Sequence, residues 1–132
     1  MAEPVLHLAI PVRDLAEARA FYVDALGCQV GRVRPTWIDV WFFGMQITLA
    51  EQPDEVWPVE EQGVRHFGVV LPDPATHASV ITRLREHDVT WVSPPTDHTE
   101  LELSGKRSAK VADPSGNIIE IKHYPDPAAL RV

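Results

Sequence analysis

The chain has few of the residues that mark disulfide-bonded or membrane-spanning proteins. Cys28 is its only cysteine, so no disulfide can form within the chain, and we expect a reducing compartment, the cytoplasm. No apolar run approaches the roughly 20 residues that cross a bilayer. The opening residues 1–4 have neither the basic start nor the apolar stretch of a secretory signal.

Basic residues are also scarce. The 12 Lys and Arg residues face 19 Asp and Glu residues, which gives a net charge of −7, and the basic residues form no dense cluster. This balance opposes binding to a phosphate backbone, so we expect a small-molecule partner and no nucleic acid. The hydrophobic content of 45% in 132 residues is enough for the core of one compact domain.

An internal duplication is the main pattern that the sequence does contain. The segment His7–Asp14 and the segment His66–Asp73 both read as a strand that begins with histidine and ends near an aspartate able to cap a helix. Duplication would place the two imidazoles at equivalent points of a two-fold related structure. Two equivalent imidazoles suggest a metal site.

Each copy predicts the same order of elements, βαβββ. In the first module, residues 5–50, we expect a helix from Asp14 to Gly27 and strands over residues 5–12, 28–33, 36–43 and 45–50. Residues 51–63 read as a surface linker. In the second module, residues 64–125, we expect a helix from Asp73 to about His87, a long polar loop over 93–105, and strands over 66–71, 89–92, 106–113 and 118–123. Residues 126–132 form a short tail.

Alternation in the last strand of each module separates two faces. Ile47 and Leu49 lie opposite Gln46, and Ile119 and Ile121 lie opposite Glu120. Because helices cover the apolar face of such a sheet, the other face is free to line a cavity, and we expect His7, Gln46, His66 and Glu120 there. Two histidines and one carboxylate form a ligand set suited to Fe(II), Mn(II), Ni(II) or Zn(II).

Three motifs resemble the vicinal oxygen chelate superfamily. They are the paired strand-opening histidines, the helix end Ala20–Gly27, and the turn and strand Asp113–Glu120. This superfamily contains glyoxalases, extradiol ring-cleaving dioxygenases, fosfomycin-resistance enzymes and metal-free bleomycin-resistance proteins. The resemblance implies an α+β fold in which two βαβββ modules form a cupped, barrel-like mixed sheet with helices on the outer face. It also implies a homodimer and places the ligand positions at His7, Gln46, His66 and Glu120.

The resemblance leaves three functions open. The first is an extradiol-dioxygenase-like oxidoreductase in which His7, His66 and Glu120 hold a divalent metal, Fe(II) by preference, and the substrate chelates it through adjacent oxygens. The second is a glyoxalase-like isomerase or lyase, in which Glu120 also moves a proton; Gln46 stands where a bacterial-type glyoxalase would have glutamate. The third is a bleomycin-resistance-like drug-binding protein without catalysis.

Further residues complete the expected site. His98 in the polar loop is a candidate acid-base residue, and Lys110 stands roughly where the resemblance to dioxygenases would place a tyrosine. Trp41 and Phe43 are candidates to wall a substrate pocket, and Lys122, on the same face as Glu120, to neutralise an anionic substrate. Whether one chain holds each metal or two chains share it stays open at this point.

Overall fold

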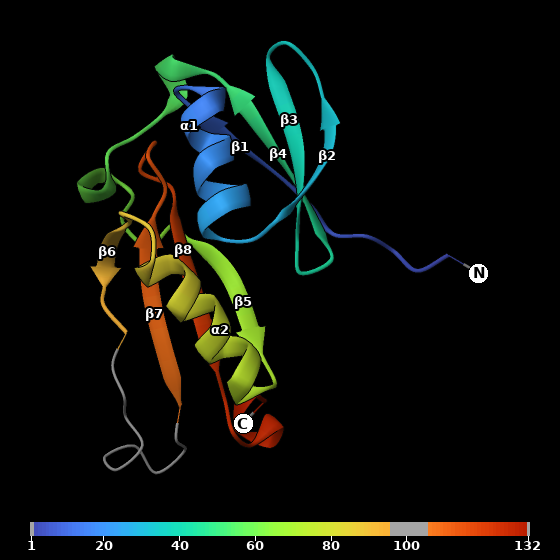
Figure 1. The fold of residues 1–132 in the computed structure, drawn as a ribbon, viewed down its shortest axis with the longest axis vertical. Coiled ribbons are helices and arrows are strands. Elements are labelled where there is room, and N and C mark those ends of the chain that lie inside the picture. The colour runs from blue at the N-terminus through green and yellow to red at the C-terminus, as the bar shows by residue number, and fades with distance from the viewer. Residues whose placement is uncertain (1, 96–105, 132) are drawn as a thin grey trace.

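The computed structural model describes residues 2–95 and 106–131, and this part of the chain forms two four-stranded sheets (Figure 1). The first sheet has the strand order β1-β4-β3-β2 and the second has β5-β8-β7-β6. In both sheets the first and last strands of the module run parallel, and the remaining pairs are antiparallel. The predicted pair of βαβββ modules is therefore confirmed.

The first module follows the predicted order, with one difference in its helix. Asp14 caps the helix by accepting a hydrogen bond from the Glu17 backbone N–H at 2.9 Å, and Gly27, at φ 87°, ends the helical stretch. Between these residues the α-helix widens into a π-helix, in which the Leu26 N–H donates to the Phe21 carbonyl. The elements are β1 (His7–Val12), α1 (Leu15–Arg19), η1 (Ala20–Ala25), β2 (Gln29–Val33), β3 (Trp37–Phe42) and β4 (Met45–Glu51).

The second module begins its helix in the same way. Asp73 accepts a hydrogen bond from the Ala75 N–H, and Pro74 occupies the first helical position. The elements are β5 (Phe67–Leu71), α2 (Pro74–Arg85), β6 (Thr90–Ser93), β7 (Arg107–Ala112) and β8 (Ile118–His123). The linker contains the short 3-10 turns η2 (Pro53–Glu55) and η3 (Val59–Glu61), and the tail contains η4 (Pro127–Leu130).

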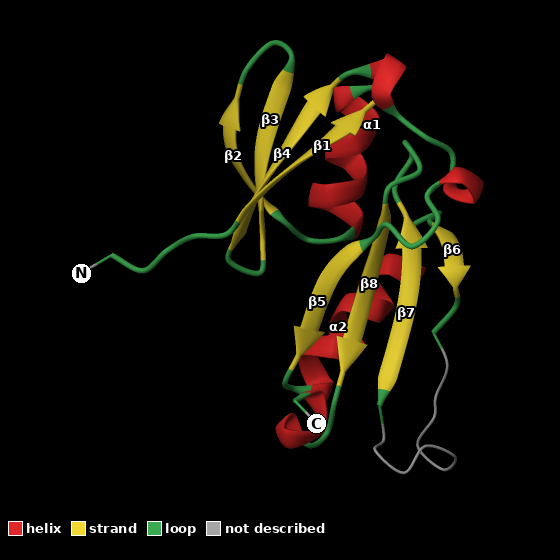
Figure 2. Cartoon of the chain, turned by 180° about the vertical axis from the view of Figure 1, so that it is seen from behind, coloured by secondary structure: helices red, strands yellow, loops and turns green. Residues whose placement is uncertain are grey.

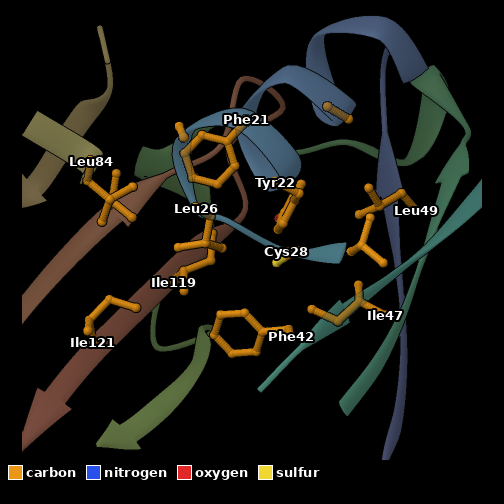
Figure 3. Packing of buried hydrophobic residues seen from close by; sticks show 14 of the residues in the cluster. Phe21, Tyr22, Leu26, Cys28, Phe42, Ile47, Leu49, Leu84, Ile119 and Ile121 are labelled. Atoms are coloured by element: carbon orange, nitrogen blue, oxygen red, sulfur yellow. The ribbon is translucent and has the colours of Figure 1, made fainter. Parts of the chain in front are cut away.

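A single hydrophobic core joins the two modules. Ile47 and Leu49 of β4 and Ile119 and Ile121 of β8 are each 0% exposed and belong to one cluster. Cys28 and Phe42 lie between the two sets of side chains (Figure 3). The predicted alternation is confirmed on the apolar side, because the buried residues of both last strands face the helices. Gln46 and Glu120 therefore lie on the opposite side of their sheets.

The strands of residues 2–95 and 106–131 form two separate sheets that do not close into one barrel. β1 and β5 each hydrogen-bond to one strand and so form sheet edges (Figure 2). Polar contacts also link the modules: Arg83 of α2 donates to the carbonyls of Asp24 at 3.0 Å and Val23 at 3.3 Å. In the described part of the chain, no helix is long and apolar enough to cross a membrane.

Candidate functional site

His66 and Glu120 meet on the open face of the second sheet. His66 lies just before β5, and its Nε2 is 3.3 Å from Oε1 of Glu120. The other ring nitrogen, Nδ1, is 2.8 Å from the carbonyl oxygen of Val64. Because a carbonyl can only accept, Nδ1 carries a hydrogen, and in a neutral ring Nε2 is then an acceptor. Two acceptors face each other, so the contact needs a proton or a cation between them.

Two lysines share this face with Glu120. Lys122 Nζ lies 3.4 Å from the same Oε1 atom, and Lys110 is the residue of β7 directly opposite Glu120 in the sheet register. A cavity of about 240 Å³ is lined by His66, Glu120 and Lys122 together with residues of β5. One carboxylate beside two ammonium groups leaves this face with excess positive charge, which suits an anionic ligand.

A glycine allows β5 to lie close to Glu120. Gly68 is the register partner of Glu120, and a Cβ at Gly68 would lie 1.9 Å from the Glu120 carbonyl oxygen. No side chain fits at that separation. The absence of a Cβ at Gly68 therefore allows the Glu120 backbone to lie next to β5, directly after His66.

The first sheet carries a second polar set on its corresponding face. His7 is the register partner of Gln46, and Asp39 of β3 is the partner of Thr48. Asp39 is only 1% exposed and accepts hydrogen bonds from Thr48 Oγ1 at 2.7 Å and from Arg32 Nε at 2.8 Å. Gln46 Nε2 approaches the same carboxylate at 3.4 Å. Asp39 is thus the centre of this set.

The hydrogen bonds to Asp39 keep it ionised. Burial by itself would raise the pKa of Asp39, but hydrogen bonds from Thr48 and Arg32 and the charges of Arg32 and His7 together hold the pKa below its ordinary value. The sequence reasoning missed this residue. A sequence signal was present, because Asp39 is the one carboxylate in the otherwise apolar strand Trp37–Phe42.

The sheet register also identifies the counterpart of Glu120 in the first module. Gly44 and Gly116 both have positive φ, 86° and 93°, and both precede the last strand of their module. Thr48 and Glu120 follow these glycines at the same interval. Their partners agree, because Thr48 pairs with Ala9 and Glu120 pairs with Gly68, each two positions after a strand-opening histidine. Thr48, and not Gln46, therefore occupies the position of Glu120.

The four predicted ligands form two pairs within one chain. His66 and Glu120 are in contact, whereas His7 and Gln46 lie on the other sheet. Among residues 2–95 and 106–131, no group of three or more His, Cys, Asp or Glu side chains is placed to hold a metal ion. A single chain therefore carries one half of the predicted ligand set on the first sheet and the other half on the second sheet.

The remaining predicted residues do not all lie on the open faces of the two sheets. Trp41 is the register partner of Gln46 and is 36% exposed on the same face. Phe43 lies in the turn between β3 and β4, with φ 48°, and its ring packs edge to face on Phe42. Phe43 is therefore at the end of the sheet and not on its open face. His98 lies outside the described residues.

A mainly apolar cavity of about 320 Å³ adjoins His66 at the junction of the modules. Its apolar wall includes Leu8 and Ile10 of β1, Phe67 of β5 and Trp57 of the linker. Arg65 adds a cation to the lining, and its guanidinium stacks on the Trp57 ring at 4.8 Å from the centroid. His66 lines both this cavity and the polar one.

Comparison with known proteins identifies the family. The model of the glyoxalase/bleomycin resistance protein/dioxygenase superfamily matches residues 5–121. No curated protein matches the chain.

Solved structures agree with that match. A glyoxalase/bleomycin resistance protein/dioxygenase from Alicyclobacillus acidocaldarius is 31% identical, with 95% of this chain and 94% of that chain covered and a TM-score of 0.83. The fosfomycin resistance protein FosX from Listeria monocytogenes (15% identity, 93% and 94% covered, TM-score 0.72) and a lactoylglutathione lyase from Agrobacterium tumefaciens (18%, 92% and 94%, 0.66) share the fold. The chain belongs to the glyoxalase/bleomycin resistance protein/dioxygenase superfamily, the vicinal oxygen chelate group that its motifs resemble.

Proposed function

We propose that the protein is a metal-dependent enzyme of the vicinal oxygen chelate type, acting as an extradiol-dioxygenase-like oxidoreductase on a small substrate with two adjacent oxygens. The observation that carries this proposal is the contact of His66 Nε2 with Glu120 Oε1 at 3.3 Å. The backbone carbonyl of Val64 orients the imidazole so that its free nitrogen faces the carboxylate. A divalent cation between these atoms would satisfy both acceptors.

The chemistry of the donors fits such a cation. His66 and Glu120 would supply an imidazole nitrogen and a carboxylate oxygen, and His7 would supply a second imidazole nitrogen, a set compatible with Fe(II), Mn(II), Ni(II) or Zn(II). When bound, the metal would supply Lewis acidity that lowers the pKa of a substrate hydroxyl. Gln46, which approaches the Asp39 carboxylate, would act as a neutral fourth ligand or a polar group beside the site.

The protein's own side chains would bind and orient the substrate. Lys122, 3.4 Å from the Glu120 carboxylate, and Lys110, across the sheet from it, would attract an anionic oxygen. Trp41, exposed on the corresponding face of the first sheet, offers a flat surface for an aromatic ring. Asp39 stays ionised, so we assign it the role of a fixed negative charge near His7 and not that of a base.

We infer that a second copy of the chain completes the site. Within the described residues β1 and β5 are sheet edges, and His7 at the start of β1 and His66 just before β5 belong to different sheets of one chain. The segment before β1 extends away from the body of the molecule (Figure 1) and exposes Val5 (56%) and Leu6 (72%), which a partner would cover. In a two-fold dimer, His7 of one copy would join His66 and Glu120 of the other.

Mixed dimers test the shared site. His7→Ala and His66→Ala chains are each expected to lose metal binding as homodimers. After the two variants are unfolded and refolded together, mixed dimers would contain one intact site, and roughly a quarter of the wild-type metal would return, because half of the dimers are mixed and each has one of two sites. The measurement is metal content per chain after dialysis. No recovery in the mixture would contradict a shared site, and wild-type metal content in both homodimers would contradict the ligand set.

Oxygen uptake tests the reaction. The protein is first loaded with Fe(II) under anaerobic conditions and then assayed in the presence of O2. It is expected to cleave catechols and to consume O2, and Glu120→Gln is expected to abolish this turnover. Arg19→Gln, an exposed change on α1, is the matched control. Product formation that needs no oxygen would contradict the dioxygenase assignment. Isomerisation of the methylglyoxal–glutathione adduct under Ni(II) or Zn(II) would instead support the glyoxalase-like alternative, in which Glu120 moves a proton.

The apolar cavity beside His66 favours one alternative function, that of a drug-binding protein without catalytic activity. Its volume of about 320 Å³ and its lining by Leu8, Ile10, Trp57 and Phe67 suit a drug-sized apolar ligand. A drug-binding protein would keep its affinity for such a ligand after His7→Ala and would bind no divalent metal. Metal analysis of the purified, untagged protein separates this alternative from the enzyme.

A further inference from the structure

A second polar pocket lies on the helix-covered side of the second sheet. It has a volume of about 180 Å³, and the described residues that line it include His77, Thr82 and Arg85 of α2 and Arg107 of β7. Arg107 is the register partner of His123, which is buried, whereas Glu120 faces the other side of β8. The pocket is therefore separated by the sheet from the His66–Glu120 pair.

Two buried nitrogen atoms beside this pocket have no hydrogen-bond partner among the described atoms. They are Nε2 of His77, a residue only 5% exposed, and Nε of Arg107. A buried polar atom without a partner is destabilising, and most such atoms in native proteins are paired with protein or with a bound species. Arg107 Nε is a donor, whereas His77 Nε2 is an acceptor, because the other nitrogen of the neutral ring donates to the Ile121 backbone, so a polar ligand that can both accept and donate belongs there.

Among the described residues that line the pocket, the charged side chains all have one sign. Arg85 and Arg107 supply two guanidinium groups, and the described lining contains no carboxylate. The helix α2 has no acidic residue along its length, and Glu120, the one acid in β7 and β8, faces away. The imidazole of His123 lies 6.1 Å from that of His77, measured between ring centroids. Burial, with the charges of His123 and Arg107, lowers the pKa of His77, although a hydrogen bond with the Ile121 backbone opposes this.

We propose that this pocket binds a small oxyanion, a phosphate group, through Arg85, Arg107 and Nε2 of His77. Guanidinium groups bind phosphate oxygens through paired N–H donors, so the anion would give Arg107 Nε its acceptor, and a protonated phosphate oxygen would donate to His77 Nε2. The volume of about 180 Å³ is small for a drug-sized ligand but accommodates one tetrahedral oxyanion. The site is independent of the metal proposed on the other side of the sheet.

Nuclear magnetic resonance of the His77 ring tests the proposal on the whole protein. Titration with inorganic phosphate at constant ionic strength is expected to give a saturable shift of the His77 ring signals. Arg85→Gln, on an exposed side chain, is expected to weaken binding about tenfold or more, since one charge-assisted contact is lost. Arg107→Gln should have the same effect, and Arg85→Lys a smaller one.

The matched control is Arg19→Gln, which removes the same charge from the exposed surface of α1. It should leave the phosphate affinity unchanged. A non-saturable shift, or equal weakening by the control, would overturn the proposal. Glycerol phosphate distinguishes the source of the anion: equal affinity indicates a phosphate group carried by a larger molecule, and binding of inorganic phosphate alone indicates the free ion.

Discussion

At the scale of single residues, a buried polar network holds the second module against the first. Asp113, which is 4% exposed, accepts hydrogen bonds from the Tyr22 hydroxyl at 2.7 Å and from the backbone N–H groups of Ser115 and Asn117. Asn117 Nδ2 donates to the Pro11 carbonyl at 2.9 Å. The turn that carried the family resemblance is therefore also a contact between modules.

The charge of Asp113 is stabilised only in part. Burial raises the pKa of Asp113 above its ordinary value, although hydrogen bonds from Asn117, Tyr22 and Ser115 oppose the shift. A carboxyl group with a raised pKa in the folded state favours folding at low pH. That contribution is lost as the pH rises from the unfolded pKa through the folded one.

Tyr22→Phe tests this network. Loss of the hydroxyl donor should raise the pKa of Asp113 further and lower the free energy of unfolding by about 2 kcal/mol at about pH 7, where the carboxylate is charged. At about pH 4 the loss should be smaller, because the raised pKa of Asp113 increases the share of the protonated carboxyl in the folded state. Urea unfolding at both pH values measures the effect, and Tyr124→Phe is the control. An equal loss at both pH values would contradict the assigned pKa shift.

At the scale of elements, glycines set the positions of strands in two different ways. Gly44, at φ 86°, makes a turn that leads into β4, and a Cβ there would meet no atom within 4 Å. Gly68 has no positive φ, but a Cβ there would collide with the Glu120 backbone. The first glycine is required by backbone conformation and the second by the close approach of β5 and β8.

Gly68→Ala and Gly44→Ala should separate these two causes. We expect Gly68→Ala to lower the free energy of unfolding by about 3 kcal/mol, because two paired strands must move apart. Gly44→Ala should cost about 1 kcal/mol, from backbone strain alone. Chemical denaturation measures both, and metal titration adds a second readout, since Gly68→Ala should displace Glu120. Equal costs for the two variants would contradict the close approach at Gly68.

At the scale of the whole molecule, the modules share one core. Cys28 lies in the cluster that also contains Leu84 of α2 and Ile119 of β8 (Figure 3). Burial raises the pKa of the Cys28 thiol to about 12, although the nearby Arg83 charge lowers it. Arg83 itself crosses between the modules to the Asp24 carbonyl. Neither module can open without exposing part of the common core.

Thiol labelling of Cys28 should report global unfolding. We expect labelling in native buffer to be slow and to accelerate with urea in parallel with the loss of helical and tryptophan signals, because the thiol becomes accessible only when the shared core opens. Trp41 in the first module and Trp91 in the second provide separate fluorescence probes in single-tryptophan variants. Two distinct transitions for these probes would contradict a single cooperative core.

The sequence alone predicted the order of elements, the faces of the strands and the two strand-opening histidines. Alternation and capping are local sequence patterns, and duplication is a repeat that can be recognised by comparing two segments of the sequence, so all three can be read without a structure. The sequence also favoured Gln46 as the fourth site residue, because it lies on the correct face, although the equal spacing from Gly44 to Thr48 and from Gly116 to Glu120 was the signal that indicates Thr48.

Only the tertiary structure decided which of these residues meet. The cross-strand register assigns Thr48 to the position of Glu120 and places the buried Asp39 opposite Thr48. The packing of both modules on one core leaves His7 on a different sheet from His66, so one chain carries the ligand set in two parts. The physical reason is that register and module packing depend on contacts between residues far apart in the chain, whereas alternation and capping depend on neighbours.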